Sequence, residues 1–228
     1  MDARTLAEIN AARQERRAVV VVTDIATGEQ RLLHAGAEME DELRAEVEQR
    51  LKSGKSGVVS LGDGENFIQV HVPSPRLVII GAVHISQALV PMAQACGFDV
   101  LVIDPRTAFA TEERFPSVEL RAEWPQEILP DRPLDAYTAL VAVTHDPKID
   151  DMPLQSALKH DCFYIGALGS RKTHAKRVSR FEEAGFAASD MERIHAPIGL
   201  DIRAASPAEI AVSVMAEIIE TLRKGPPV

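Results

Sequence analysis

The sequence predicts an α/β protein with a doubly wound, mostly parallel sheet, and three observations carry this prediction. Residues 77–80 form a continuous aliphatic run, which is typical of a strand buried on both faces of a parallel sheet. Directly after Gly81 the apolar period changes to that of a helix, which ends near Gly97. A second buried run, 100–103, then ends on Asp104. A strand, a helix and a second strand in this order form the unit from which doubly wound sheets are built.

The turn after the first strand matches a dinucleotide-binding turn only in part. Such a turn needs three glycines, for the tight bend, for close approach of the pyrophosphate and for helix packing. These positions hold Gly81, Val83 and Ser86, so the turn supports a Rossmann-like fold strongly and an NAD(P) site weakly. Asp104 stands where such sites place the acid that binds the ribose, and Arg106 follows it. Gly81 is therefore either part of a ligand-binding turn or a tight turn without a ligand.

Composition and charge narrow the class of protein. The 228 residues suffice for one full α/β domain and a smaller piece. A net charge of −9 argues against a general nucleic-acid binder, because phosphate backbones require a basic face. No apolar run reaches the roughly 20 residues of a membrane span. The N-terminal segment also lacks the apolar core of a signal peptide, so we expect a soluble cytoplasmic protein.

The two cysteines, Cys96 and Cys162, lie far apart and form no C-x-x-C motif. Neither a zinc site nor a disulfide framework is therefore indicated, and no metal ligand is assigned. We expect both cysteines to be small, buried, apolar side chains.

Residues 1–75 are predicted to form a small α+β unit that precedes the larger domain, residues 76–228. Its expected elements are a helix around Leu6 and Ile9, strands 18–22 and 31–33, an amphipathic helix over 38–51, and strands 57–61 and 66–72. The amphipathic helix and the first two strands suggest a helix packed on a hairpin. Gly62-Asp63-Gly64 is a hairpin turn signal, and Pro73-Ser74-Pro75 marks the boundary between the two parts.

The larger domain continues with alternating strands and helices. Its expected elements are a polar loop over 104–116, strand 118–120, a short helix from Trp124, strands 137–143 and 162–165, and a final helix after Ser206. Ser206, Pro207 and Glu209 form a capping box at the start of that helix. Ile210, Val214, Ile218 and Leu222 then give its buried stripe, and Gly225-Pro226 ends it.

The segment after strand 137–143 carries three acids at the start of a predicted helix. Asp146 is well placed as the N-cap, with Pro147 at the first helical position. Asp150 and Asp151 follow near the positive end of the helix dipole. Capping and dipole effects alone are sufficient to explain all three acids.

A cation-rich helix follows the glycine turn at 166–170. Arg171, Lys172, Lys176, Arg177 and Arg180 occupy its first turns, although the positive end of a helix disfavours cations. In an acidic protein this pattern indicates an anion-binding site, because a helix N-terminus that follows a glycine loop is a common phosphate-binding site. The alternative is a solvated basic face.

The turns that follow Ile80, Ile103, Val143 and Ile165 are expected to converge, because the carboxyl ends of parallel strands meet at one edge of the sheet. Histidines fall in or beside these turns and a late loop, namely His84, His145, His174 and His195. Any one of them is more often a helix-end hydrogen-bonding residue than a ligand.

Five segments together resemble a known family. They are GAVHIS, DPRTAFATEERFP, THDPKIDD, YIGALGSRKTHAKR and RIHAPIGLDI, in this order and spacing. Over about residues 76–223 the chain is similar to the C-terminal Rossmann-like domain of the XdhC/CoxI family, accessory factors for xanthine dehydrogenase and other molybdenum hydroxylases. The resemblance implies a protein that binds molybdenum cofactor (molybdopterin), protects it while a cysteine desulfurase supplies the terminal sulfur, and delivers it to the apo-enzyme.

The turns and the resemblance together select the candidate cofactor-binding residues. They are Gly81, His84, Asp104, Arg106, Thr144, His145, Asp146, Gly166, Gly169, Ser170, Arg171, Thr173, His174, Gly199 and Asp201. A phosphate and a polar pterin suit such a set of cationic, hydroxyl and amide groups. No residue is assigned a catalytic role.

The chain departs from the family pattern at two places. Longer family members have a leading domain with P-R-x-x-G and G-G-C motifs, and residues 1–75 contain neither. The leading unit is therefore a reduced or diverged version, and no cysteine ligand is expected from that region. Arg203 stands where the family commonly has the final glycine of G-L-D-I-G, so a side chain is placed beside the site.

Three functions remain open at this point. The first is a cofactor-maturation chaperone without turnover of its own, with a molybdenum hydroxylase apo-enzyme and a cysteine desulfurase as partners. The second is an NAD(P)-dependent oxidoreductase, and the third is a scaffold protein whose nucleotide site has decayed. Proteins of this size and kind often pair, so we expect a homodimer.

Overall fold

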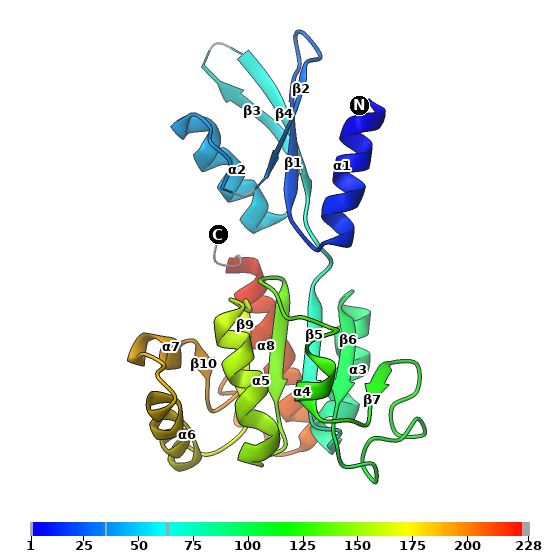
Figure 1. Ribbon diagram of the computed structural model, residues 1–228, viewed down its shortest axis with the longest axis vertical. Helices are drawn as coiled ribbons and strands as arrows, with labels where there is room; N and C mark the ends of the chain where they lie inside the picture. Colours follow the sequence, from blue (N-terminus) through cyan, green and yellow to red (C-terminus); the bar gives the residue numbers. More distant parts are fainter. Residues whose placement is uncertain (1, 35, 63, 225–228) are drawn as a thin grey trace. The chain divides into compact units, whose positions relative to one another are not determined.

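The computed structural model describes residues 2–34, 36–62 and 64–224, and these fall into two compact units (Figure 1). One unit extends to Pro73 and the other runs from Ser74 to Leu222. The turn residue Asp63 and the end signal Gly225-Pro226 lie outside the described residues.

The first unit is a four-stranded antiparallel sheet with two helices. Its elements are α1 (Ala3–Gln14), β1 (Val19–Asp24), β2 (Gln30–His34), α2 (Asp41–Ser53), β3 (Gly57–Leu61) and β4 (Gly64–His71). The strand order is β2-β1-β4-β3, so the predicted hairpin and the two later strands join in one sheet. Ile9 and Ala12 of α1 pack against Val19 and Val21 of β1. Leu43, Val47 and Leu51 form the buried face of α2, as the amphipathic helix expected over 38–51 predicts.

The second unit is a doubly wound parallel sheet. Its elements are β5 (Arg76–Ile80), α3 (His84–Ala95), β6 (Asp99–Ile103), β7 (Glu119–Arg121), α4 (Pro125–Ile128), β8 (Thr138–Ala142), α5 (Pro147–Lys159), β9 (Tyr164–Ala167), α6 (Arg171–Glu183), α7 (Ala188–Glu192), β10 (Ile194–His195) and α8 (Pro207–Lys224). All neighbouring strands are parallel, in the order β10-β9-β8-β5-β6-β7. The predicted α/β class is therefore confirmed.

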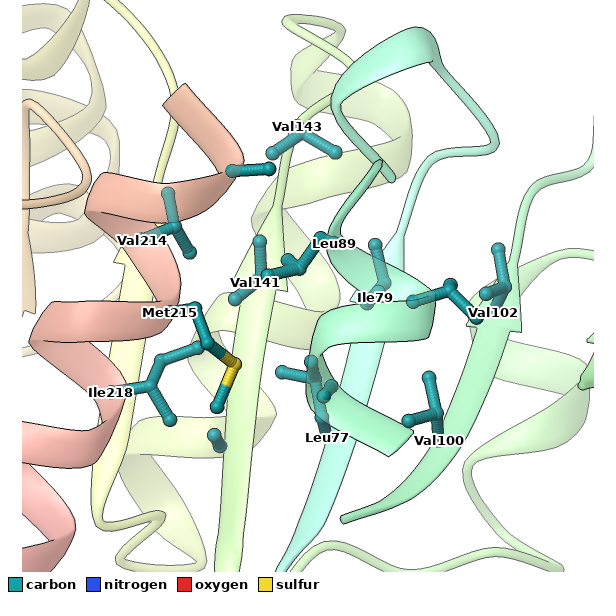
Figure 2. Close-up of a cluster of buried hydrophobic side chains, with 14 of the residues drawn as sticks. Leu77, Ile79, Leu89, Val100, Val102, Val141, Val143, Val214, Met215 and Ile218 are labelled. Atoms are coloured by element: carbon teal, nitrogen blue, oxygen red, sulfur yellow. The ribbon is translucent and has the colours of Figure 1, made fainter. Parts of the chain in front are cut away.

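Alternating side chains of the central strands build two separate cores, because successive residues of a strand point to opposite faces. Leu77 and Ile79 point into the core shared with α3 and α8, which Figure 2 shows together with Val214 and Ile218. Val78 and Ile80 point into the core that α4, α5, α6 and α7 cover. The central strands are buried on both faces, which explains why their sequences read as continuous apolar runs.

The order of the strands defines where a ligand site belongs. The chain passes from β5 to β6 on one side and returns to β8 on the other, so the strand order reverses beside β5. Ligands of open α/β sheets bind at such a switch point, outside the carboxyl ends of the strands. The turns after β5 and β8 meet there, since a Cβ atom on Gly81 would lie 2.8 Å from Cγ2 of Thr144.

Two local expectations are wrong. The strand expected at 162–165 is β9, Tyr164–Ala167, so Gly166 lies within a strand and not in the turn that follows it. Cys96 is exposed, because it is the C-terminal cap of α3 and lies beyond the buried stripe of that helix. Cys162 is buried as expected, and burial raises the pKa of its thiol to about 12.

Candidate functional site

The turn after β5 is held by a buried carboxylate. Asp104, at the end of β6, accepts hydrogen bonds from the backbone N–H of Ala82 (2.7 Å) and from Nε and Nη2 of Arg106 (2.9 and 2.7 Å). Burial opposes ionisation of Asp104, but the hydrogen bonds from Arg106 and Ala82 outweigh it and lower its pKa. Both carboxylate oxygens are therefore committed to the protein, and a ribose hydroxyl would have to displace one of these donors.

The polar loop between β6 and β7 is more ordered than its sequence indicates. The guanidinium of Arg114 donates to the carbonyl oxygens of Ala82 (2.9 Å) and Phe109 (2.7 Å) and to the side chain of Gln87 (3.0 Å). The exposed ring of Phe109 lies 4.7 Å from the guanidinium carbon of Arg106. Sequence reasoning missed Arg114, whose bonding partners lie up to 32 residues away in the chain.

The turn after β8 contains a capped helix start. Asp146 is the N-cap of α5 and accepts from the N–H of Lys148 at 2.9 Å, which confirms the predicted cap. Oγ1 of Thr144 accepts from the N–H of Asp146 at 3.0 Å. His145 is exposed and has φ +64°, a conformation uncommon for residues other than glycine. Backbone strain of this kind gathers at functional sites.

Capping does not explain the other two acids of this segment, contrary to the interpretation from sequence. Asp150 is 1% exposed and its Oδ1 accepts from Oγ1 of Thr144 at 2.6 Å. Burial raises the pKa of Asp150 to about 6, against the opposing effects of Thr144 and Arg177. Asp151 binds Arg180 of α6 through both carboxylate oxygens, at 2.6 and 2.9 Å.

The start of α6 combines a local cap with exposed cations. The N–H of Thr173 donates to Oγ of Ser170 (3.2 Å), and the N–H of His174 donates to the carbonyl oxygen of Ser170 (2.9 Å). The N–H groups of Arg171 and Lys172 are therefore the remaining donors of the first turn. The side chains of both residues are exposed and have no ion-pair partner in the part of the chain that the structure describes.

Two further residues of α6 are turned inward. Arg177 is 3% exposed, and its Nη2 donates to the carbonyl oxygen of Leu168 at 3.4 Å. Its Nε lies 4.0 Å from Oδ1 of Asp151, which is too long for a hydrogen bond. Burial lowers the pKa of Arg177, and burial together with Arg177 lowers the pKa of His174.

Several buried polar atoms of this region lack a hydrogen-bond partner among the described residues. They are Oδ2 of Asp150, Nδ1 of His174, and Nε and Nη1 of Arg177. Such atoms are rare in folded proteins, and each needs a physical reason. Neither Asp150 nor Arg177 could be recognised from the sequence as a buried residue with unpartnered atoms. Asp150 also fits the pattern of an acid at a helix start, and Arg177 fits that of a basic helix surface.

The remaining candidates are distributed around the rest of the unit. His84 is the exposed first residue of α3. Gly166 packs in β9, where a Cβ atom would lie 2.5 Å from Cδ1 of Ile198. The N–H of Gly199 donates to Oε2 of Glu217 at 2.8 Å, and Asp201 accepts from the N–H of Arg203 at 3.3 Å. The structure thus brings together the turns after β5, β6, β8 and β9, whereas Gly199 contacts α8.

A second polar cluster links β9, β10 and α8. Glu217 accepts from the hydroxyl of Tyr164 at 2.6 Å, and its other oxygen lies 3.0 Å from Nδ1 of His195. The rings of Tyr164 and His195 are stacked, with centroids 4.6 Å apart. Burial and Glu217 raise the pKa of Tyr164, so its hydroxyl stays protonated and donates. Of this cluster, only His195 stands out in the sequence.

Other possible sites have less suitable chemistry. No helix in the described ranges is long and apolar enough to cross a membrane. No group of three or more metal-ligating side chains occurs among those same residues. A groove of about 390 Å³ is lined by Leu129, Met152, His160 and their neighbours, but its lining contains no Asp, Glu, Lys or Arg. The exposed cations at the start of α6 suit an anionic ligand better than this groove does.

Comparison with known proteins identifies the family. The family described as the XdhC Rossmann domain matches residues 77–218. A Bacillus subtilis protein named as a probable xanthine dehydrogenase subunit is 35% identical over 69% of this chain and 46% of its own length. The molybdenum cofactor insertion chaperone PaoD of Escherichia coli is 30% identical over 64% of this chain and 40% of its own length. The chain thus spans less than half the length of these curated relatives.

A solved structure supports the fold of the whole chain. The crystal structure of a xanthine dehydrogenase from Bacillus halodurans has a TM-score of 0.65 with this chain at 22% identity. The structural match covers 96% of this chain and 64% of the Bacillus halodurans chain. At this identity the likeness shows the fold alone. Together with the family match over most of the second unit, these findings confirm the resemblance seen in the sequence, and the chain belongs to the XdhC family through its XdhC Rossmann domain.

Proposed function

We propose that this protein binds molybdenum cofactor and acts as an accessory protein of a xanthine dehydrogenase-type molybdenum hydroxylase. The names of two relatives, an insertion chaperone and a probable xanthine dehydrogenase subunit, support this role. The structural observation that carries it is the start of α6, where exposed cations surround a helix end and buried polar groups lie directly behind it. This arrangement suits a ligand that is anionic at one end and polar at the other.

The phosphate of the cofactor is assigned to the turn Gly169–Thr173. The N–H groups of Arg171 and Lys172 and their side chains would donate to its oxygens, because the positive end of a helix favours an anion. Ser170 shapes this turn through its cap to Thr173. Charge-assisted hydrogen bonds of this type are about twice as strong as neutral ones.

The polar groups of the neighbouring turn are assigned to the rest of the cofactor. Thr144, His145 and Asp146 follow β8, and His174 lies one turn into α6. We assign His145, Asp146 and His174 as contacts to the pterin or to the oxygen ligands of the metal. The strained backbone of His145 supports this assignment, because it places an exposed imidazole at the edge of the sheet.

In this proposal the protein is a carrier without turnover of its own. It holds the cofactor while a cysteine desulfurase supplies the terminal sulfur, and it then releases the cofactor to the apo-enzyme. Release requires binding through several modest contacts from turns, and the sites described above are of this kind. We propose that it acts in the cytoplasm as a homodimer.

An NAD(P)-dependent oxidoreductase is less well supported. Asp104, the residue that would bind a ribose, already accepts hydrogen bonds from Ala82 and Arg106. Gly81 is required by its close packing on Thr144, so its presence does not point to a pyrophosphate. A scaffold without a ligand is disfavoured by the cost of burying polar atoms of Asp150 and Arg177 that have no hydrogen-bond partner among the described residues.

A binding comparison tests the proposed function. The purified chain is titrated with molybdenum cofactor released from a donor enzyme and, separately, with NADH. We expect saturable binding of the cofactor near one per chain and no saturable binding of NADH. Binding of NADH without binding of the cofactor would favour the oxidoreductase and contradict the proposal.

A further inference from the structure

We infer that Asp150 and Arg177 recognise the aminopyrimidinone edge of the pterin. This edge carries the 2-amino group, N3–H and the 4-oxo oxygen, and it lies at the opposite end of the cofactor from the phosphate. The inference rests on the proposed function and specifies which atoms of the ligand the protein contacts. Nothing in the sequence pattern assigns either residue to this role.

The two residues are buried on α5 and α6, and each keeps polar atoms that have no hydrogen-bond partner among the described residues. Asp150 is 1% exposed and Arg177 is 3% exposed, and Nε of Arg177 lies 4.0 Å from Oδ1 of Asp151, the residue that follows Asp150. Nevertheless, Oδ2 of Asp150 and both Nε and Nη1 of Arg177 have no hydrogen-bond partner in the described part of the chain. Buried charges are normally paired and hydrogen-bonded, so these atoms are suited to complete their bonds with a ligand.

The chemistry of the unpartnered atoms selects the ligand. The unpartnered Oδ2 of ionised Asp150 has two lone pairs that accept donors, while Oδ1 keeps its bond to Thr144, and a guanidinium presents several donors in a fixed plane. The aminopyrimidinone edge offers the complement, two adjacent donors beside one acceptor. A phosphate has only acceptors at neutral pH and would be repelled by Asp150, while a metal cation would be repelled by Arg177.

The positions of the pair fit the orientation of the whole cofactor. Asp150 is tied to the turn after β8 through Thr144, and Arg177 is tied to the turn after β9 through the carbonyl of Leu168. The exposed start of α6 at Arg171 lies about 9 Å along the helix axis from Arg177. A cofactor with its phosphate at Arg171 would therefore extend its pterin edge toward the pair. Both residues are almost fully buried, so entry of the pterin edge requires a local movement of the chain around them.

Recognition of this edge can be tested with two small probes, pterin and lumazine. Lumazine carries a 2-oxo group in place of the 2-amino group, so it presents an acceptor where pterin presents a donor. We expect the wild-type chain to bind pterin about 10-fold or more tightly than lumazine. In Asp150→Asn the amide can donate to the 2-oxo group, so the preference should reverse.

Two further variants complete the design. Asp151→Asn is the matched control for a change of charge beside Arg177. Its carboxylate binds Arg180 and lies 4.0 Å from Nε of Arg177 without a hydrogen bond, so the variant should keep the wild-type preference. Arg177→Leu removes the donors to the 4-oxo oxygen, which pterin and lumazine share, so both should bind at least about 10-fold more weakly. This variant also provides a test if Asp150→Asn does not fold.

The outcomes separate this inference from the proposed function. An unchanged preference for pterin in folded Asp150→Asn, or equal binding of both probes to the wild type, would overturn the inference. If intact cofactor still binds in those cases, the proposed function is retained, and only the assignment of Asp150 and Arg177 to the pterin edge is rejected. If the wild type binds neither the cofactor nor pterin, the proposed function and this inference are both rejected.

Discussion

The hydroxyl of Thr144 donates to Oδ1 of Asp150 over 2.6 Å, and this bond connects the turn after β8 to a carboxylate that is almost completely buried. The other oxygen of Asp150 has no partner among the described residues. A carboxylate held in this way is costly to ionise, and burial accordingly raises its pKa to about 6. The protein keeps a destabilising group at the edge of its sheet, as functional sites often do.

We predict that Asp150→Asn stabilises the protein at pH 8. The pKa of Asp150 is about 6 in the folded chain and near 3.8 when unperturbed. The folded state therefore binds the proton more tightly, and this contribution to stability is lost as pH rises through about 6. The shift corresponds to about 3 kcal/mol at most, which should appear as a higher melting temperature of the variant at pH 8.

The pH dependence of the stability difference between Asp150→Asn and the wild type provides an internal control for this prediction. At pH 4 and below Asp150 is protonated when folded, so the variant and the wild type should have nearly equal stability. Asp151 is different because Arg180 hydrogen-bonds both of its carboxylate oxygens, so Asp151→Asn should show no gain at pH 8. A variant Asp150→Asn that is less stable than the wild type at pH 8 would contradict the account of burial.

Asp146 allows capping and ligand binding to be separated. As the N-cap of α5 it should contribute about 1 kcal/mol, so Asp146→Ala should lower the free energy of unfolding by this amount. Asp146→Ser keeps a capping oxygen and should restore stability. If the side chain also contacts the cofactor, Asp146→Ser will remain weak in cofactor binding, whereas full recovery of affinity would limit Asp146 to capping.

Arg171 should contribute to binding and not to folding. Its side chain is exposed, so Arg171→Ala should leave the melting temperature within about 1 °C of the wild type, while it weakens cofactor binding about 10-fold or more. The effect should decrease at high salt, because the contact is electrostatic. Arg31→Ala, which removes an exposed cation of the first unit, serves as the control for net charge. Equal affinities of Arg171→Ala and the wild type would place the phosphate elsewhere.

Gly166 should be required for packing. A Cβ atom at this position would lie 2.5 Å from Cδ1 of Ile198 and 2.8 Å from Cε1 of Tyr164. Gly166→Ala should therefore cost about 1 to 3 kcal/mol in denaturant unfolding. Ile198→Val removes the closest atom, so the double variant should recover part of this loss. Additive losses in the two variants would show that the clash with Ile198 is not the cause.

The parts of the fold that could be predicted are those with a local signal. The buried strands around Leu77 and Leu140 are continuous aliphatic runs, and Asp146 with Pro147 is a capping pattern readable over a few residues. The capping box at Ser206 and Glu209 also forms as predicted. Each of these features depends on neighbours in the chain, so no tertiary information was needed.

The parts of the site that could not be predicted depend on helix packing. Asp150 and Arg177 are 27 residues apart, and only the packing of α5 and α6 on one face of the sheet makes them a pair. In the sequence, Asp150 is equally well explained by the helix dipole and Arg177 by a basic surface. Glu217 and Tyr164 are likewise joined only by the packing of α8 against β9. Sequence periodicity predicts which face of a helix is buried but not which polar groups meet there.

The central claim, that the chain carries molybdenum cofactor, is tested most directly by the composition of the isolated protein. The full chain is purified from a host that makes the cofactor and is supplied with molybdate, and both molybdenum and pterin are measured per chain. The account predicts equal amounts of the two that approach one per chain in the wild type and that fall about 10-fold or more in Arg171→Ala. A folded wild-type protein with neither molybdenum nor pterin, from a host whose own molybdenum enzymes are loaded, would contradict it.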